Sequence, residues 1–83
     1  MKLYGYTRHE AEPDDVIPSE LAEITLVADA EELREIAQFL IQAADGIDLH
    51  GSQWQHEHLG DVHKRFEHGP HFVVFNPAAD DLC

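Results

Sequence analysis

Hydrophobic residues recur through the middle of the chain at the three- and four-residue spacing of an amphipathic α-helix. The stripe consists of Leu33, Ile36, Ala37, Leu40, Ile41, Ala44 and Ile47. Asp29 can cap the start of this helix, because Glu32 follows three residues later, as a capping box requires. Gly46 or Gly51 offers an end. We expect the stripe to face the core, so that Leu40→Ala costs about 2–5 kcal/mol of unfolding free energy.

Two stretches before this helix alternate with the period of a β-strand. Residues 2–7 alternate and place an aromatic row on one face. Residues 21–28 alternate in the same way, which turns Ile24 and Leu26 toward the core. We therefore expect two strands to precede the helix.

Two further strands are expected after the helix, which gives the order β-β-α-β-β. Residues 71–75 form a compact β-forming run, and residues 53–59 alternate more weakly. One helix can cover only one face of a sheet, so the pattern predicts an α+β fold with an antiparallel sheet of three to four strands. The other face must meet water or a partner. Residues 1–83 are expected to form a single domain, with a flexible loop at 8–20 and a flexible tail at 76–83.

The chain is strongly acidic. Five Lys and Arg stand against seventeen Asp and Glu, which gives a formal net charge of −12. Such a charge repels nucleic acid and anionic lipid, and it attracts cationic partners, whose encounter it accelerates at low salt. Solubility alone is the simpler explanation of the same acidity.

The chemistry of the chain points to a reducing compartment. Cys83 is the single cysteine, so no disulfide within the chain and no cysteine-based zinc site is expected. No apolar run approaches the roughly 20 residues that cross a bilayer, and no secretory signal stands at the start. We therefore expect a cytoplasmic protein that binds neither membrane nor nucleic acid.

Six of the seven histidines lie between residues 50 and 71. On a strand, His56 and His58 share one face, and a third ligand such as His63 or His71 would complete a zinc or nickel site. Protonation of these imidazoles near pH 6.5 would instead make the net charge respond to pH. Histidine is also a common surface residue, so a metal-binding module is kept as an alternative.

Catalysis has little support in the sequence. Neither Ser19 nor Ser52 stands in the context of an activated nucleophile, and no glycine-rich phosphate loop is present. The chain is therefore not expected to be an enzyme. Trp54 is either a core anchor or, together with Tyr4 and Tyr6, an aromatic centre for binding.

Several segments in order resemble a known family. They are MKLYGY at residues 1–6, EITLVA at 23–28, AEELREIAQFL at 30–40, HEHL at 56–59 and FVVF at 72–75. Together they resemble immunity protein family thirty-two of the bacterial polymorphic toxin systems. The resemblance implies a cytosolic protein that neutralises a cognate toxin by direct, non-catalytic binding, and it carries over no catalytic residue.

The acidity agrees with that implication, because a toxin that attacks nucleic acid needs a basic cleft that carboxylates can occupy. The toxin is thus expected to be basic, and a nuclease would fit. Candidate contacts are Glu31, Glu35, Asp45 and Asp48 on the helix, Glu10, Glu12, Asp14 and Asp15 on the loop, and the aromatic residues Trp54, Tyr4 and Tyr6. A homodimeric interaction domain that uses the uncovered sheet face is the remaining alternative.

Overall fold

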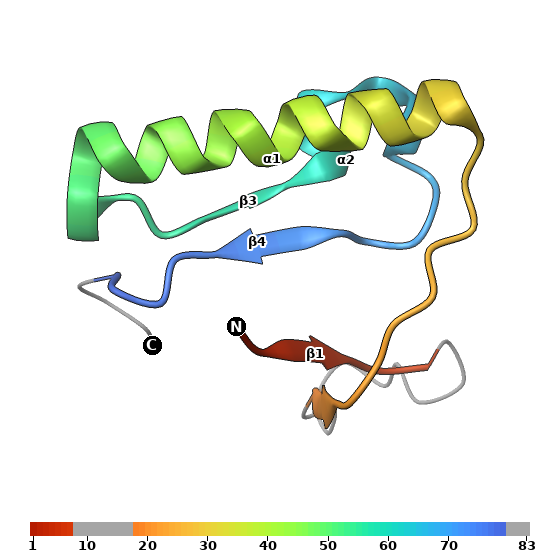
Figure 1. The fold of residues 1–83 in the computed structure, drawn as a ribbon, viewed down its shortest axis with the longest axis horizontal. Helices are drawn as coiled ribbons and strands as arrows, with labels where there is room; N and C mark the ends of the chain where they lie inside the picture. Colours follow the sequence, from red (N-terminus) through yellow and green to blue (C-terminus); the bar gives the residue numbers. More distant parts are fainter. Residues whose placement is uncertain (8–17, 80–83) are drawn as a thin grey trace.

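The computed structural model describes residues 1–7 and 18–79, and it has an α+β fold. One long helix, α1 (Ala30–His50), is accompanied by four short strands that form two antiparallel pairs. Figure 1 shows α1 running along one side of the molecule, with β3 and β4 beneath it. The predicted fold class and the order of strands around the helix are confirmed.

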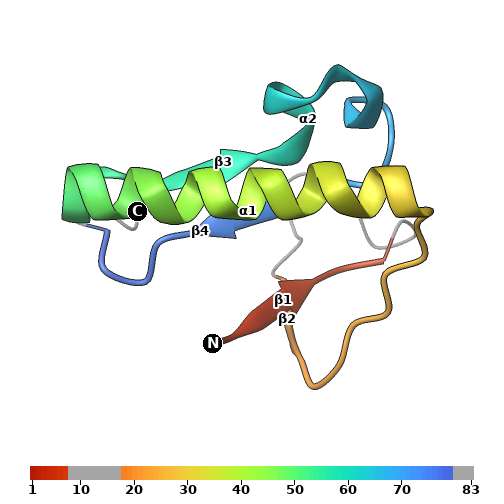
Figure 2. The ribbon, with the colours of Figure 1, turned by 45° about the horizontal axis from the view of Figure 1, so that its top comes forward.

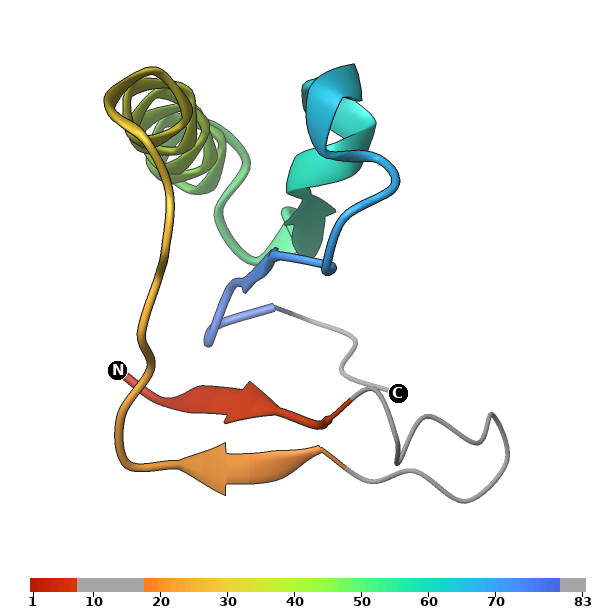
Figure 3. The ribbon, with the colours of Figure 1, turned by 90° about the vertical axis from the view of Figure 1, so that its right-hand side faces the viewer.

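The four strands form two separate sheets instead of one. Strand β1 (Leu3–Gly5) pairs with β2 (Ser19–Leu21), and β3 (His56–His58) pairs with β4 (Val73–Phe75). Figures 2 and 3 show the β1–β2 pair standing apart from β3 and β4. The two pairs do not share a ladder, so each keeps free edges.

The second predicted strand is placed differently. Of residues 21–28, only Leu21 belongs to β2, whereas Ser19 and Glu20, which were expected in the loop, form the rest of it. Ile24 and Leu26 are each 48% exposed, so they do not face the core. The predicted loop acids Glu10, Glu12, Asp14 and Asp15 lie outside the described residues.

The ends of α1 follow from local chemistry. The side chain of Asp29 accepts a hydrogen bond from the Glu32 backbone N–H at 2.8 Å, and Glu32 Oε1 accepts one from the Asp29 N–H at 3.0 Å. The expected capping box is therefore present. At the other end Gly51 has φ 56°, a backbone conformation that glycine adopts without a steric penalty. Gly46 lies within the helix.

The core is small and centred on Phe39, which is 1% exposed. Ile36 and Leu59 complete its buried part, and the ring of Phe72 meets that of Phe39 edge-on at 6.3 Å between centroids. Phe66 and Val74 pack against this cluster from outside. The cluster thus ties α1 to the end of β3 and to the start of β4, which lie opposite each other.

The predicted apolar stripe of α1 is only partly buried. Ile36 is buried as expected, but Leu33, Leu40 and Ile41 are 44%, 43% and 62% exposed. The helix is rotated so that Phe39 and Ala43 face the core instead. The β3–β4 pair covers one narrow side of the helix, so part of a broad apolar stripe is left in solvent.

The β3–β4 ladder continues beyond its assigned strands. The Leu59 N–H donates to the Phe72 carbonyl at 2.8 Å, and the Asn76 N–H donates to the Gln55 carbonyl at 2.8 Å. Because side chains alternate along a strand, the face that carries Leu59, Phe72 and Val74 is the one toward α1. The opposite face carries His56, His58, Val73 and Phe75.

Short helical turns fill the connection between β3 and β4. Helix α2 (Leu59–Val62) and the 3₁₀ turn η3 (Lys64–Phe66) lie beside α1, and another 3₁₀ turn, η2 (Gly51–Gln53), follows α1 directly. Within the described residues, no helix combines the length and the apolar character that crossing a bilayer requires.

Asn76, a polar residue that is only 2% exposed, fixes the end of the fold. Its Nδ2 donates to the Gly51 carbonyl at 3.1 Å and to the Trp54 carbonyl at 2.8 Å, while its Oδ1 accepts from the Ala78 N–H at 3.0 Å. Ala79 beside it is also buried. The start of the tail, for which the sequence offered no anchor, is therefore attached to the end of α1.

We predict opposite outcomes for two neighbouring helix positions. Phe39→Ala empties the centre of the core and should cost about 3–5 kcal/mol of unfolding free energy. Leu40→Ala, at a largely exposed side chain, should cost well under about 2 kcal/mol. Urea denaturation of both variants measures the difference. Equal costs at the two positions would contradict the observed rotation of the helix.

We also predict that Asn76 cannot be replaced without loss of stability. Asn76→Ala should cost about 2–4 kcal/mol of unfolding free energy, because the two carbonyl groups and the amide that bond to Asn76 then lose their hydrogen-bond partner. Asn76→Asp should cost more, since a carboxylate oxygen then faces those carbonyls. The control is Gln55→Ala, at an exposed side chain, which should change stability by about 0.5 kcal/mol or less. Stable Asn76 variants would show that the network contributes little.

Candidate partner-binding surface

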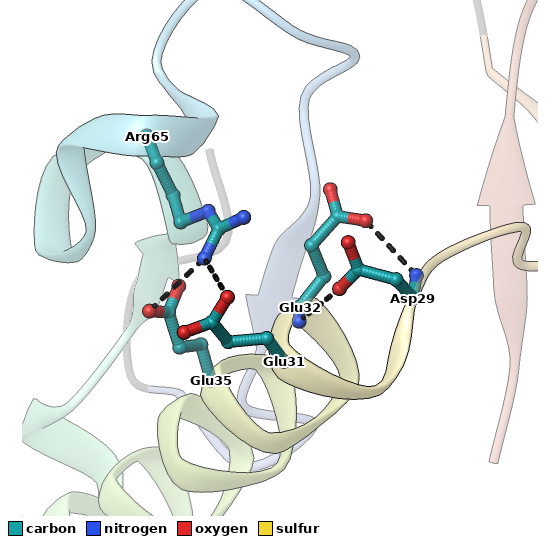
Figure 4. A network of polar contacts seen from close by, with 5 residues as sticks. All are labelled: Asp29, Glu31, Glu32, Glu35 and Arg65. Carbon is teal, nitrogen blue, oxygen red and sulfur yellow. Dashed lines mark hydrogen bonds and ion pairs between the residues drawn. The ribbon is translucent and has the colours of Figure 1, made fainter.

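Two of the acids predicted as partner contacts are engaged inside the protein. Arg65 of η3 reaches across to α1, where its Nη1 lies 3.4 Å from Glu35 Oε1 and 3.9 Å from Glu31 Oε2 (Figure 4). The Glu35 side chain is 30% exposed, and that of Glu31 is 78% exposed. Glu35 therefore holds η3 against α1, whereas Glu31 remains largely accessible.

The same contact neutralises one of the few cations. Partial desolvation disfavours the charge of Arg65, but the carboxylates of Glu35, Glu31 and Glu32 outweigh it and raise the pKa of the guanidinium. Arg65 thus stays charged and directed toward α1. A cation held in this way repels an approaching basic partner less than a free one would.

The other two predicted acids of the helix lie free on its outer face. Asp45 and Asp48 are exposed, and neither forms an ion pair with another described residue. Ile41 and Leu49, one turn to either side of Asp45, are 62% and 78% exposed. The C-terminal half of α1 therefore presents apolar and acidic side chains together.

Trp54 is a structural anchor. A Cβ placed on Gly46 would lie 2.5 Å from Trp54 Nε1 and 2.8 Å from Trp54 Cδ1, so the indole lies directly on the backbone of α1. Tyr4 and Tyr6 are 58% and 54% exposed on and beside β1. Among the described residues neither tyrosine makes an aromatic contact with Trp54, so the predicted three-residue aromatic centre is not assembled.

Three of the four predicted metal ligands lie close together. The rings of His56 and His58 have centroids 5.4 Å apart, and those of His58 and His71 are 6.3 Å apart. His63 instead packs edge-on against Phe66. Within residues 1–7 and 18–79, no three His, Cys, Asp or Glu side chains are arranged to hold a metal ion.

A hollow of about 300 Å³ opens beside the end of β3. Its lining residues are His58, Gly60, Asp61, Phe66, Glu67, His71 and Phe72. Two carboxylates, of Asp61 and Glu67, and two phenyl rings in one lining suit a cationic group, such as a lysine or arginine side chain from another protein. Glu67 Oε1 also lies 3.3 Å from His68 Nε2.

The sequence pattern did not predict that the segment between β2 and α1 would be exposed on the surface. Among the described residues, none of residues 22–28 forms a backbone hydrogen bond. Val27 is 92% exposed, and Ile24 and Leu26 are half exposed. The β-forming alternation of this segment was visible in the sequence, but nothing there showed that the strand would lack a neighbour.

We predict that Gly46→Ala destabilises the protein although alanine favours helix. The steric conflict with Trp54 should cost about 1–3 kcal/mol, more than the roughly 1 kcal/mol gained in helix propensity. Gln42→Ala, at an exposed position of the same helix, is the matched control and should leave the melting temperature nearly unchanged. If Gly46→Ala melts at or above the wild-type temperature, Trp54 does not pack as described.

Comparison with known proteins adds no relative. No protein-family model matches the chain, and neither a curated protein nor a solved structure matches it. Its function is therefore argued from its own residues.

Proposed function

We propose that this protein is a non-catalytic binding protein that neutralises a basic partner, as the immunity proteins it resembles neutralise a cognate toxin. The observation that carries the proposal is the occurrence of exposed carboxylates among exposed apolar side chains. Between residues 18 and 33 the sequence contains five acids and no Lys or Arg. In the same stretch Ile24, Leu26, Val27 and Leu33 are between 44% and 92% exposed.

The apolar part of this surface supports contact with a protein in particular. Of the described residues, five apolar ones are buried, whereas thirteen large apolar ones are exposed. Scattered apolar residues are normal on a surface, but Ile24, Leu26 and Val27 are neighbours in the chain, and contiguous exposed apolar residues mark interaction sites. A partner that covers them gains hydrophobic stabilisation, and the carboxylates around them select a cationic one.

Asp45, Asp48 and Glu31 are the helix acids that we propose to face the partner, with Tyr4 and Tyr6 as exposed aromatic contacts. Glu35 is left out because Arg65 engages it. One Glu35 oxygen, Oε2, is buried without a hydrogen-bond partner among the described residues.

Two alternatives fit the observations less well. A homodimer must bring two bodies of formal charge −12 together, and like charges oppose that association. A metal-binding module would need a third ligand beside His56 and His58, and the described residues assemble no such group.

The test is association with the protein encoded by the neighbouring gene, where that protein carries a toxin domain. We predict a tight complex whose association rate constant falls roughly tenfold or more between 50 and 500 mM NaCl, because salt screens charge attraction. The dissociation rate should change much less. Co-expression should also protect cells from the toxin. Absence of a complex, or a complex without protection, would contradict the proposal.

A further inference from the structure

We infer that residues 22–28 are an unpaired β-strand that docks onto the exposed edge of a cationic strand in the partner protein. The inference rests on the proposed function and names the surface and the mode of contact. Figure 3 shows this segment on the outside of the molecule, running from β2 to the start of α1 and away from β3 and β4.

The backbone of the segment is available for pairing. Within the described part of the chain, residues 22–28 form no backbone hydrogen bond. The described strands pair only with one another, β1 with β2 and β3 with β4. Unpaired N–H and C=O groups in an extended segment are a template for a strand from another chain.

The side chains of the segment give it two different faces. Beyond the bend at Ala22, an extended chain would place Ile24, Leu26 and Ala28 on one face and Glu23, Thr25, Val27 and Asp29 on the other. The first face is wholly apolar, and the second has the carboxylate of Glu23 at one end and that of Asp29, which also caps α1, at the other. A partner strand that alternates apolar and cationic residues matches both faces at once.

Charge selects this occupant over a second copy of the chain. Two copies paired antiparallel about Leu26 would place Glu23 of one opposite Asp29 of the other, and like charges directly opposite each other destabilise a pair of strands. A lysine-bearing strand meets the same carboxylates with attraction. The nearby acids Glu20 and Glu31 extend the negative field along the approach.

The experiment uses the full 83-residue protein and, as probe, a ten-residue peptide that alternates Lys and Val. Fluorescence anisotropy measures its affinity, and amide hydrogen exchange locates it. We expect slowed exchange at residues 23–27 on binding, and we expect a peptide alternating Glu and Val not to bind.

Proline substitutions separate backbone pairing from side-chain contact. Successive N–H groups of a strand point to opposite edges, so Thr25→Pro removes a donor from one edge and Leu26→Pro from the other. Neither variant loses a hydrogen bond of the free protein, so the melting temperatures should stay close to wild type. At one or both positions, proline should weaken binding at least roughly tenfold more than alanine does, as loss of strand hydrogen bonds predicts.

The outcomes are distinguishable. Equal binding by the proline and alanine variants at both positions, or protection outside residues 22–28, would overturn the strand inference and leave the proposed function standing. Protection of residues 22–28 without peptide, in a protein that sediments as a dimer, would show a second copy to be the occupant and overturn it too. Failure of both the cationic peptide and the neighbouring toxin to bind would defeat the proposed function itself.

Discussion

The packing of Phe39 between α1 and the segments around β3 and β4 holds this small protein together. Phe39 is the most deeply buried apolar side chain among the described residues, and its contact with Phe72 joins the helix to the approach to β4. Leu59, which lies opposite Phe72 at the same end of the ladder, completes the cluster. Asn76 then attaches the far end of β4 to the C-terminal end of α1, so the helix is fixed along its length.

A core of this size leaves many apolar side chains exposed to solvent, and the proposed function rests on these exposed side chains. The β3–β4 pair covers one side of α1, and the β1–β2 pair stands apart from it. Part of the helical stripe and the whole segment between β2 and α1 therefore meet solvent. In a chain with a formal net charge of −12, these apolar positions lie among carboxylates, which favours contact with cationic proteins.

Local signals in the sequence predicted local structure well. The capping box at Asp29 and Glu32 is present, Gly51 ends the helix, and the run before Asn76 is a strand. Predictions that required knowledge of what lies opposite a segment did worse. The period of the helix could not show that Phe39 would replace Leu40 in the core, because Ile36, Phe39 and Ala43 form a second apolar face that adjoins the predicted stripe. Alternation at residues 21–28 indicated a strand but not the absence of a neighbour.

For the candidate site, the sequence predicted which types of residue would take part but not which contacts they would make. Glu31, Glu35, Asp45 and Asp48 lie on α1 as expected, yet the partner of Glu35 is Arg65, thirty residues away in sequence. Trp54 was correctly considered as an anchor, but its contact with Gly46 depends on the turn that follows the helix. Such contacts are set by tertiary packing, which no short-range pattern encodes.

Amide hydrogen exchange of the free protein tests the central claim most directly. That claim requires residues 22–28 to have the sequence pattern of a β-strand and yet to form no backbone hydrogen bonds in the free protein. Residues 23–28 should exchange nearly as fast as an unstructured peptide, while the amides of Phe39, Leu59 and Asn76 should be strongly protected. Slow exchange throughout residues 23–28 in the monomer would show that the strand is already paired within the chain, and the account would be wrong.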